Sequence, residues 1–115
     1  MKCMKFFLFF LLLGFILSSG LYASDTIKIG LLVPLTGPAA ADGFSAHSSV
    51  KLALERVNNA GGLLGKKVEL VVYDDRADGK EAVALARKLI EQDRVIAVVG
   101  GSYSTPSRAV APIFQ

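Results

Sequence analysis

The segment around Ser102, Ser104 and Thr105 carries three hydroxyl groups that could do chemistry. They follow a glycine pair, Gly100-Gly101, and precede an expected helix. The free N–H groups and the positive dipole end of a helix N-terminus favour an anion. Together these features suit a ligand carboxylate. The alternative is structural: Thr105 caps the helix, and the two serines face water.

A serine nucleophile is a competing interpretation of the same segment. The sequence Gly100-Gly101-Ser102-Tyr103-Ser104 follows the G-x-S-x-G pattern except at its last position. A strained nucleophile elbow needs a very small residue there, and Ser104 is a poor substitute for glycine. The triad order also asks for a histidine after the serine, whereas His47 precedes it. We therefore keep an exported serine hydrolase only as a minor alternative.

Asp74 and Asp75 form a second polar group, at the end of an apolar run. Paired carboxylates hold a metal ion or a proton in receiver-like domains. We favour a polar strand end and turn, with Arg76 balancing the charge, because aspartate is common in turns. His47 is expected at the surface or half-buried, far from any second ligand. The only cysteine is Cys3, so we expect no disulfide, no metal and no cofactor in the mature chain.

Apolar runs over 27–33, 68–73 and 95–99 predict three buried strands of a parallel sheet. Between them, apolar positions recurring at three and four residues predict helices over 44–60 and 79–92. The second half of the first helix should expose Lys51, Glu55 and Asn58. The expected inward-facing positions are Ala46, Val50, Ala53, Leu54 and Val57 in the first helix, and Ala82, Val83, Ala86, Leu89 and Ile90 in the second.

Residues at the ends of the helices predict where they begin and stop. Asp78 is a plausible N-cap, and Glu81 three residues later would complete a capping-box-like pair. Thr105 resembles the N-cap of a third helix, with Pro106 at its first position, where a missing N–H costs nothing. Pro112 limits or kinks that helix.

This order of strands and helices predicts an α/β fold: an open parallel sheet with flanking helices. The chain stops inside the third helix, so we expect a domain that is incomplete at its carboxyl end. In such sheets, ligands bind outside the carboxyl ends of the strands. Three loops qualify, at residues 34–43, 74–78 and 100–105.

The first 23 residues are predicted to be a secretory signal peptide. A basic start is followed by an apolar run over 6–17 and by small residues up to Ala23, the best candidate for the cleavage point. A membrane anchor is the alternative, but a spanning helix needs about 20 apolar residues. Lys2 and Lys5 lie in this leader, so residues 24–115 are nearly balanced in charge. That balance argues against a nucleic-acid-binding surface.

Several motifs in order resemble one known family. The sequences IKIGLLVPLTGPAAADG, LALERVNNAGGLLGKKVELVVYDDRAD and AVVGGSYSTPSRAVAP follow the leader. The most specific parts are Thr36-Gly37-Pro38, the glycine-rich turn over 59–65, and Asp74-Asp75. This pattern is similar to the amino-terminal stretch of the branched-chain amino acid (Leu/Ile/Val) binding proteins. These are the periplasmic solute receptors of ABC importers, with the type I periplasmic-binding fold.

The resemblance implies two Rossmann-like lobes that close on a small ligand, and no enzymatic activity. Residues 24–115 would form part of the first lobe. The implied function is an extracytoplasmic receptor that delivers a small amino acid or related carboxylate to the membrane permease of an ABC importer. A sensing ectodomain of the same fold, without transport, is the alternative.

The resemblance also implies roles for individual residues. Ser104 matches the hydroxyl that holds the ligand carboxylate, with Thr105, Tyr103 and Ser102 beside it. Asp42 falls where many members place an aromatic residue that covers the ligand. This departure argues against a branched-chain amino acid, because a carboxylate would desolvate badly against an aliphatic side chain.

Overall fold

A computed structural model of the protein describes residues 26–115. The predicted signal peptide, residues 1–23, lies outside the described residues. Within residues 26–115, no helix is long and apolar enough to cross a bilayer.

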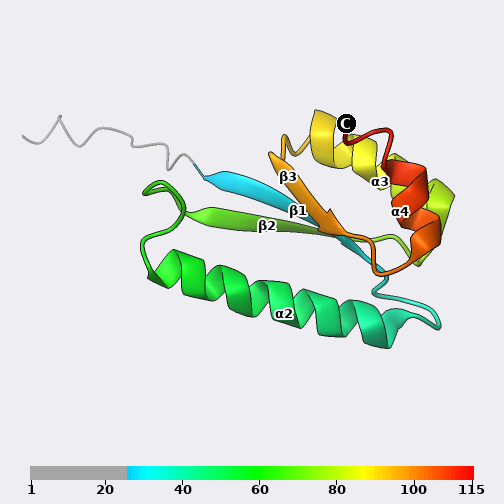
Figure 1. The fold of residues 1–115 in the computed structure, drawn as a ribbon, viewed down its shortest axis with the longest axis horizontal. Helices are drawn as coiled ribbons and strands as arrows, with labels where there is room; N and C mark the ends of the chain where they lie inside the picture. Colours follow the sequence, from blue (N-terminus) through cyan, green and yellow to red (C-terminus); the bar gives the residue numbers. More distant parts are fainter. Residues whose placement is uncertain (1–25) are drawn as a thin grey trace, which may run out of the picture.

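Three strands and three helices alternate along the described chain, as the apolar periodicity predicts. Their bounds are β1 Ile27–Val33, α2 Ala40–Asn59, β2 Val68–Asp74, α3 Gly79–Glu91, β3 Ala97–Gly100 and α4 Ser104–Val110. All strand pairs are parallel, and β1 lies between β2 and β3. Helix α2 covers one face of the sheet, and α3 and α4 lie together on the other (Figure 1). The predicted open parallel sheet with flanking helices is confirmed.

The core lies between the sheet and the α3–α4 pair. Gly30 on β1 lets Leu89 of α3 approach closely, because a Cβ atom at Gly30 would lie 3.0 Å from both Leu89 methyl groups. One cluster of buried apolar side chains joins β1 to both helices: Leu32, Ala82, Ala86 and Val110. Burial of Ala82, Ala86 and Leu89 confirms the inward face predicted for α3, and Val83 is half-buried.

Helix α2 begins at Ala40, four residues before the predicted start. The early start is possible because Gly43 packs directly on the end of β1: a Cβ atom there would lie 1.6 Å from the Pro34 carbonyl oxygen. Gly43 is the one fully buried residue of the helix. A helix at this position must therefore have glycine where it meets the strand.

The face of α2 that we predicted to be inward is only partly covered. Of the predicted positions, Ala46, Val50 and Leu54 are half-buried, whereas Ala53 and Val57 are exposed. Lys51 and Glu55 are exposed as expected. The three-stranded sheet, with α2 as the one helix on this face, covers only part of the apolar stripe predicted for α2.

Asn58 is not on the water-facing side, contrary to the sequence prediction. Its side-chain amide donates to the Val68 carbonyl oxygen and accepts from the Val68 N–H, both at 2.8 Å. A primary amide can satisfy both groups of one residue at the start of an edge strand. Asn58 therefore ties the end of α2 to the beginning of β2.

Strand β3 is shorter and more exposed than predicted. It spans Ala97–Gly100 rather than residues 95–99, and Ile96 and Val99 are 70% and 45% exposed. It pairs only with β1, so its other side is a sheet edge. Ile90 of α3, predicted to be inward, is exposed because it borders an open groove beside this edge. Apolar composition alone does not reveal that a strand is at an edge.

The ends of α3 and α4 differ in how well the sequence predicted them. Asp78 caps α3 and accepts from the N–H groups of Lys80 and Glu81 at 2.9 Å. Glu81 does not complete a capping box, because the Asp78 N–H instead donates to the Asp75 carbonyl oxygen at 2.7 Å. Helix α4 ends at Val110, before Pro112, as expected.

Thr105 does not cap α4, which corrects the sequence prediction. The helix begins at Ser104, and Tyr103, with extended backbone, is the N-cap residue. Pro106 is then the third helical residue rather than the first. This position still suits proline, because the first N–H groups of a helix have no intrahelical partner. The Tyr103 carbonyl oxygen accepts from the N–H and the Oγ of Ser107, at 3.3 and 2.5 Å.

Candidate functional site

The carboxyl ends of β1 and β3 lie side by side, with Leu32 in register with Gly100. The chain leaves β1 toward α2 on one face of the sheet and leaves β3 toward α4 on the other (Figure 1). This divergence is a topological switch point, where ligands bind in open α/β sheets. The loops predicted from the sequence at residues 34–43 and 100–105 both lie there.

Asp42 and Tyr103 meet across this switch point. The Tyr103 hydroxyl donates a hydrogen bond of 2.6 Å to Asp42 Oδ2, joining residues 61 positions apart. Phenol–carboxylate bonds of this length are charge-assisted. The bond to Asp42 raises the pKa of the Tyr103 hydroxyl above its ordinary value. Asp42 lies in the first turn of α2, where the helix dipole favours a carboxylate.

Ser102, Ser104 and Thr105 lie together on the other side of the switch point, and all three are exposed. Ser104 and Thr105 are the first two residues of α4, and Ser102 is in the turn before them. The three residues are therefore open to solvent near the carboxyl edge of the sheet, and Thr105 also borders the start of α3. The dipole of α4 contributes less than the sequence suggested, because the helix has seven residues and Pro106 lacks an N–H.

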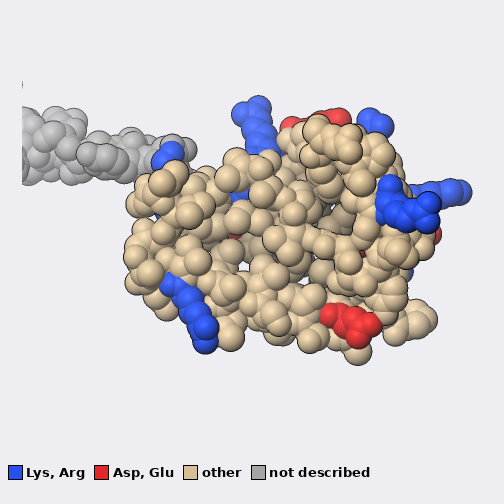
Figure 2. All heavy atoms as spheres, viewed as in Figure 1, with Lys and Arg blue, Asp and Glu red and all other residues tan. Residues whose placement is uncertain are grey.

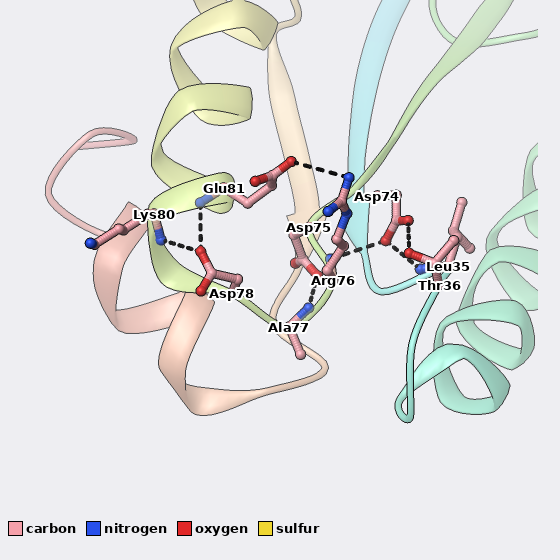
Figure 3. Close-up of polar contacts among 9 residues, drawn as sticks. All are labelled: Leu35, Thr36, Asp74, Asp75, Arg76, Ala77, Asp78, Lys80 and Glu81. Atoms are coloured by element: carbon pink, nitrogen blue, oxygen red, sulfur yellow. Dashed lines mark hydrogen bonds and ion pairs between the residues drawn. The ribbon is translucent and has the colours of Figure 1, made fainter.

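Asp74 organises the neighbouring loop. Its Oδ1 accepts from the N–H groups of Leu35 at 2.7 Å and Arg76 at 3.0 Å, and its Oδ2 accepts from the Thr36 hydroxyl at 2.6 Å (Figure 3). Burial alone would raise the pKa of Asp74, but the hydrogen bonds from Thr36, Leu35 and Arg76 outweigh it and lower the pKa. The carboxylate thus joins the loop after β1 to the loop after β2.

Asp75 has a different environment, although it is the next residue. Its side chain is 2% exposed and accepts from the Ala77 N–H at 2.9 Å. Burial raises its pKa, the Ala77 bond opposes this, and the charge of Asp74 adds to the increase. The two carboxylates point to different partners (Figure 3), as expected for a strand end and turn. Within residues 26–115, no three His, Cys, Asp or Glu side chains are grouped so that they could hold a metal ion.

Arg76 does not balance the aspartates as we predicted. Its guanidinium lies 3.8 Å from Glu81 Oε1, and only its backbone N–H reaches Asp74. Arg76 has a positive φ of 51°, which turns the chain and directs the side chain toward α3. His47 is half-buried on α2, within the range that we expected.

A pocket of about 190 Å³ lies between β3 and α4, next to the switch point. It is lined by Leu32, Asp75, Gly101, Ser107 and Phe114, among others. None of the five predicted ligand residues lines it. The pocket and the five predicted ligand residues therefore occupy different places beside the switch point.

Two hydrogen bonds at the carboxyl edge of the sheet were not predicted from the sequence: Thr36 to Asp74 and Tyr103 to Asp42. The bond from Thr36 to Asp74 could have been found, because Val33 and Asp74 end neighbouring parallel strands and the residues after Val33 must pass Asp74. The Tyr103–Asp42 bond had no short-range signal, since it depends on where α2 begins.

Comparison with known proteins settles the family. The chain matches the family described as "Periplasmic binding protein" over residues 26–115. The chain belongs to the periplasmic binding protein family. The Leucine-, isoleucine-, valine-, threonine-, and alanine-binding protein of Pseudomonas aeruginosa is 42% identical, covering 81% of this chain and 25% of that protein. The Leu/Ile/Val-binding protein of Escherichia coli K12 is 30% identical over 84% of this chain and 26% of its own length.

Solved periplasmic binding protein structures have the same fold. The branched-chain amino acid transporter substrate binding protein LivJ from Streptococcus pneumoniae, in complex with isoleucine, gives a TM-score of 0.74 at 35% identity, covering 76% of this chain and 25% of that one. A solute binding protein of an ABC transporter from Rhodopseudomonas palustris, in complex with 3,4-dihydroxybenzoic acid, gives a TM-score of 0.71 at 34% identity. This match covers 77% of this chain and 24% of that one. The chain thus spans about a quarter of the proteins it matches.

Proposed function

We propose that the protein containing this chain is an extracytoplasmic receptor that delivers a small amino acid or related carboxylate to the permease of an ABC importer. Residues 24–115 would supply part of its first lobe. The observation that carries the proposal is the position of Ser102, Ser104 and Thr105 at the β1–β3 switch point, in the turn after β3 and at the start of α4. The matched relatives are named as amino acid binding proteins, which supports the same function.

A carboxylate is the chemical group that we expect this edge to hold. The ligands in the two structures described above, isoleucine and 3,4-dihydroxybenzoic acid, differ in every other respect but share a carboxylate. On this chain, the exposed hydroxyls of Ser104 and Thr105 and the free N–H groups of the first turn of α4 can donate to one. The rest of the ligand would be contacted by residues outside this chain.

Ser104→Ala in the full gene product is expected to weaken binding of carboxylate ligands by roughly ten- to a hundredfold. A hydrogen bond to a charged group contributes about 1.5–3 kcal/mol, and about 1.4 kcal/mol is a tenfold change in affinity. Calorimetric titration with L-isoleucine, L-threonine, 3,4-dihydroxybenzoate and isoleucinamide measures this effect. The amide, which lacks a carboxylate, should bind poorly to both proteins.

Two serine variants control this experiment. Ser48→Ala, an exposed position in the middle of α2, should leave affinity unchanged. Ser102→Ala should have a small effect if Ser102 is only a solvated loop residue. Equal binding of every carboxylate by Ser104→Ala and the parent protein would place the site on the wrong residue.

Export is the cellular part of the proposal. The basic start, the apolar run over 6–17 and the small residues before Ala23 support cleavage of a signal peptide. We expect the mature protein outside the cytoplasm, with its amino terminus close to residue 24. Amino-terminal sequencing of the exported product checks this, and a product that keeps Met1 in the membrane fraction would contradict it.

A further inference from the structure

One side-chain hydrogen bond ties the segment from Gly101 to Thr105 to a distant element of the described chain, residues 26–115. After Gly100, the ladder with β1 ends. The backbone bonds of Tyr103 go to Ser107, within the same loop and helix. Among residues 26–115, the hydrogen bond from the Tyr103 hydroxyl to Asp42 is the one side-chain hydrogen bond that joins this segment to another element.

The acceptor of that bond has a fixed position. Asp42 directly precedes Gly43, whose Cα packs so closely on the Pro34 carbonyl that no side chain fits between them. The Gly43 N–H also donates to the carbonyl oxygen of Ala39, the N-cap residue of α2. The backbone at Asp42 is thus held against the end of the central strand, and the Asp42 carboxylate accepts from Tyr103 there.

The donor of the bond is adjacent to the residue that we place in the ligand site. Tyr103 is the N-cap residue of α4, and Ser104 is the first residue of that helix. A ring held at its hydroxyl end fixes the Tyr103 side chain, and with it the direction in which the chain enters α4. The bond therefore connects the start of α4, at Ser104, through Tyr103 to Asp42 on the other side of the switch point.

We propose that Tyr103 is a positioning residue: its hydrogen bond to Asp42 across the β1–β3 switch point holds Ser104 ready for a ligand carboxylate. This inference rests on the proposed binding function of Ser104. Ligand affinity depends on such preorganisation, because a loop that is already ordered loses less conformational freedom when the ligand binds.

A set of variants separates the hydrogen bond from the charge of Asp42. Tyr103→Phe removes only the hydroxyl. Asp42→Asn removes the negative charge but keeps an oxygen that accepts from a phenol, whereas Asp42→Ala removes both. Each is made in the full gene product, alone and combined with Tyr103→Phe. The probe is whichever of L-isoleucine, L-threonine and 3,4-dihydroxybenzoate binds the parent protein most tightly in calorimetry.

We expect the loss of affinity caused by Tyr103→Phe to depend on whether residue 42 carries a hydrogen-bond acceptor. Tyr103→Phe should weaken probe binding by about three- to tenfold when residue 42 is Asp or Asn, and should have no effect in the Asp42→Ala background. Tyr73→Phe is a matched control, because it removes a similar bond, of 3.0 Å to Asp93, away from the switch point. It should leave affinity unchanged. Thermal melts of each variant confirm that it folds.

Three outcomes would overturn the inference. The first is unchanged affinity in Tyr103→Phe together with lost binding in Ser104→Ala. This result would refute the role of Tyr103 and still agree with the proposed function. The second is an equal loss from Tyr103→Phe in all three backgrounds, which would mean that the hydroxyl acts without Asp42. The third is unchanged affinity in Ser104→Ala, or no binding of any probe by the parent protein, which removes the proposed site as well.

Discussion

Gly43→Ala should destabilise the protein by about 3 kcal/mol or more, at the upper end of the cost of overpacking a well-packed site. The added Cβ atom would lie 1.6 Å from the Pro34 carbonyl oxygen and 2.5 Å from its carbon. Both are backbone atoms next to the central strand, so no side-chain rotation relieves the clash. Helix α2 must move away from β1 or lose its first turn.

Urea unfolding of the full gene product measures the effect of Gly43→Ala. Ser45→Ala, two residues further along the same helix and exposed, is the matched control and should stay within about 0.5 kcal/mol of the parent. Because Asp42 precedes Gly43, the variant should also weaken ligand binding. A midpoint equal to that of the parent protein would show that α2 does not pack on Pro34 as the structure has it.

Asp74→Ala is expected to cost about 2–3 kcal/mol at neutral pH, since hydrogen bonds to a carboxylate are stronger than neutral ones and its partners are partly open to water. It leaves the N–H of Leu35, the hydroxyl of Thr36 and the N–H of Arg76 without their acceptor. Thr36→Val, which removes one of the three bonds, should cost less. Chemical unfolding of both variants, compared with the parent, tests this order.

The pH dependence of Asp74 has a definite sign. Its pKa in the folded protein is lowered from the ordinary value of 3.8. A carboxylate with a lowered pKa contributes stability that is fully present above the unfolded value and is lost as the pH falls through the folded value. The difference in unfolding free energy between the parent and Asp74→Ala should therefore be constant near neutral pH and shrink below about pH 4. A difference that grows on acidification would contradict the assignment.

Asp75→Asn is the matched contrast, one residue away. The pKa of Asp75 is raised from 3.8, chiefly by burial, so the folded protein holds that proton more tightly than the unfolded chain does. Its contribution to stability therefore falls as the pH rises from the unfolded value through the raised folded value. Asparagine keeps an acceptor for the Ala77 N–H without the charge. Asp75→Asn should be neutral or stabilising at pH 7, opposite in sign to Asp74→Ala.

Neighbouring residues were enough to predict β1, β2 and the N-cap of α3. The β1 run matches its observed bounds, and β2 is longer by one residue, because short β-branched runs bounded by Pro34 and Asp75 leave little freedom. The cap of α3 was found because an aspartate before a periodic segment accepts from the first N–H groups directly. Parallel topology followed from the alternation of these elements.

What the sequence could not predict depends on packing between distant segments. The exposure of Ile96 follows from β3 being at the edge, which is a property of strand order and not of the strand. The inward position of Asn58 depends on where α2 meets β2. At the candidate site, the roles of Ser102, Ser104 and Thr105 remain a prediction from residue types. The Tyr103–Asp42 bond could not be predicted, because it depends on the start of α2, set by Gly43 and Pro34.

The two Asn58–Val68 hydrogen bonds have a practical consequence for attaching a label to the protein. They close the base of the turn between α2 and β2 and join the helix to the strand directly. Leu64 lies in this turn, is 90% exposed, and is at the amino end of the strands, opposite the candidate site. Exposed turns of this kind tolerate insertions. A fluorophore or an inserted reporter domain at Leu64 would therefore lie away from the candidate site.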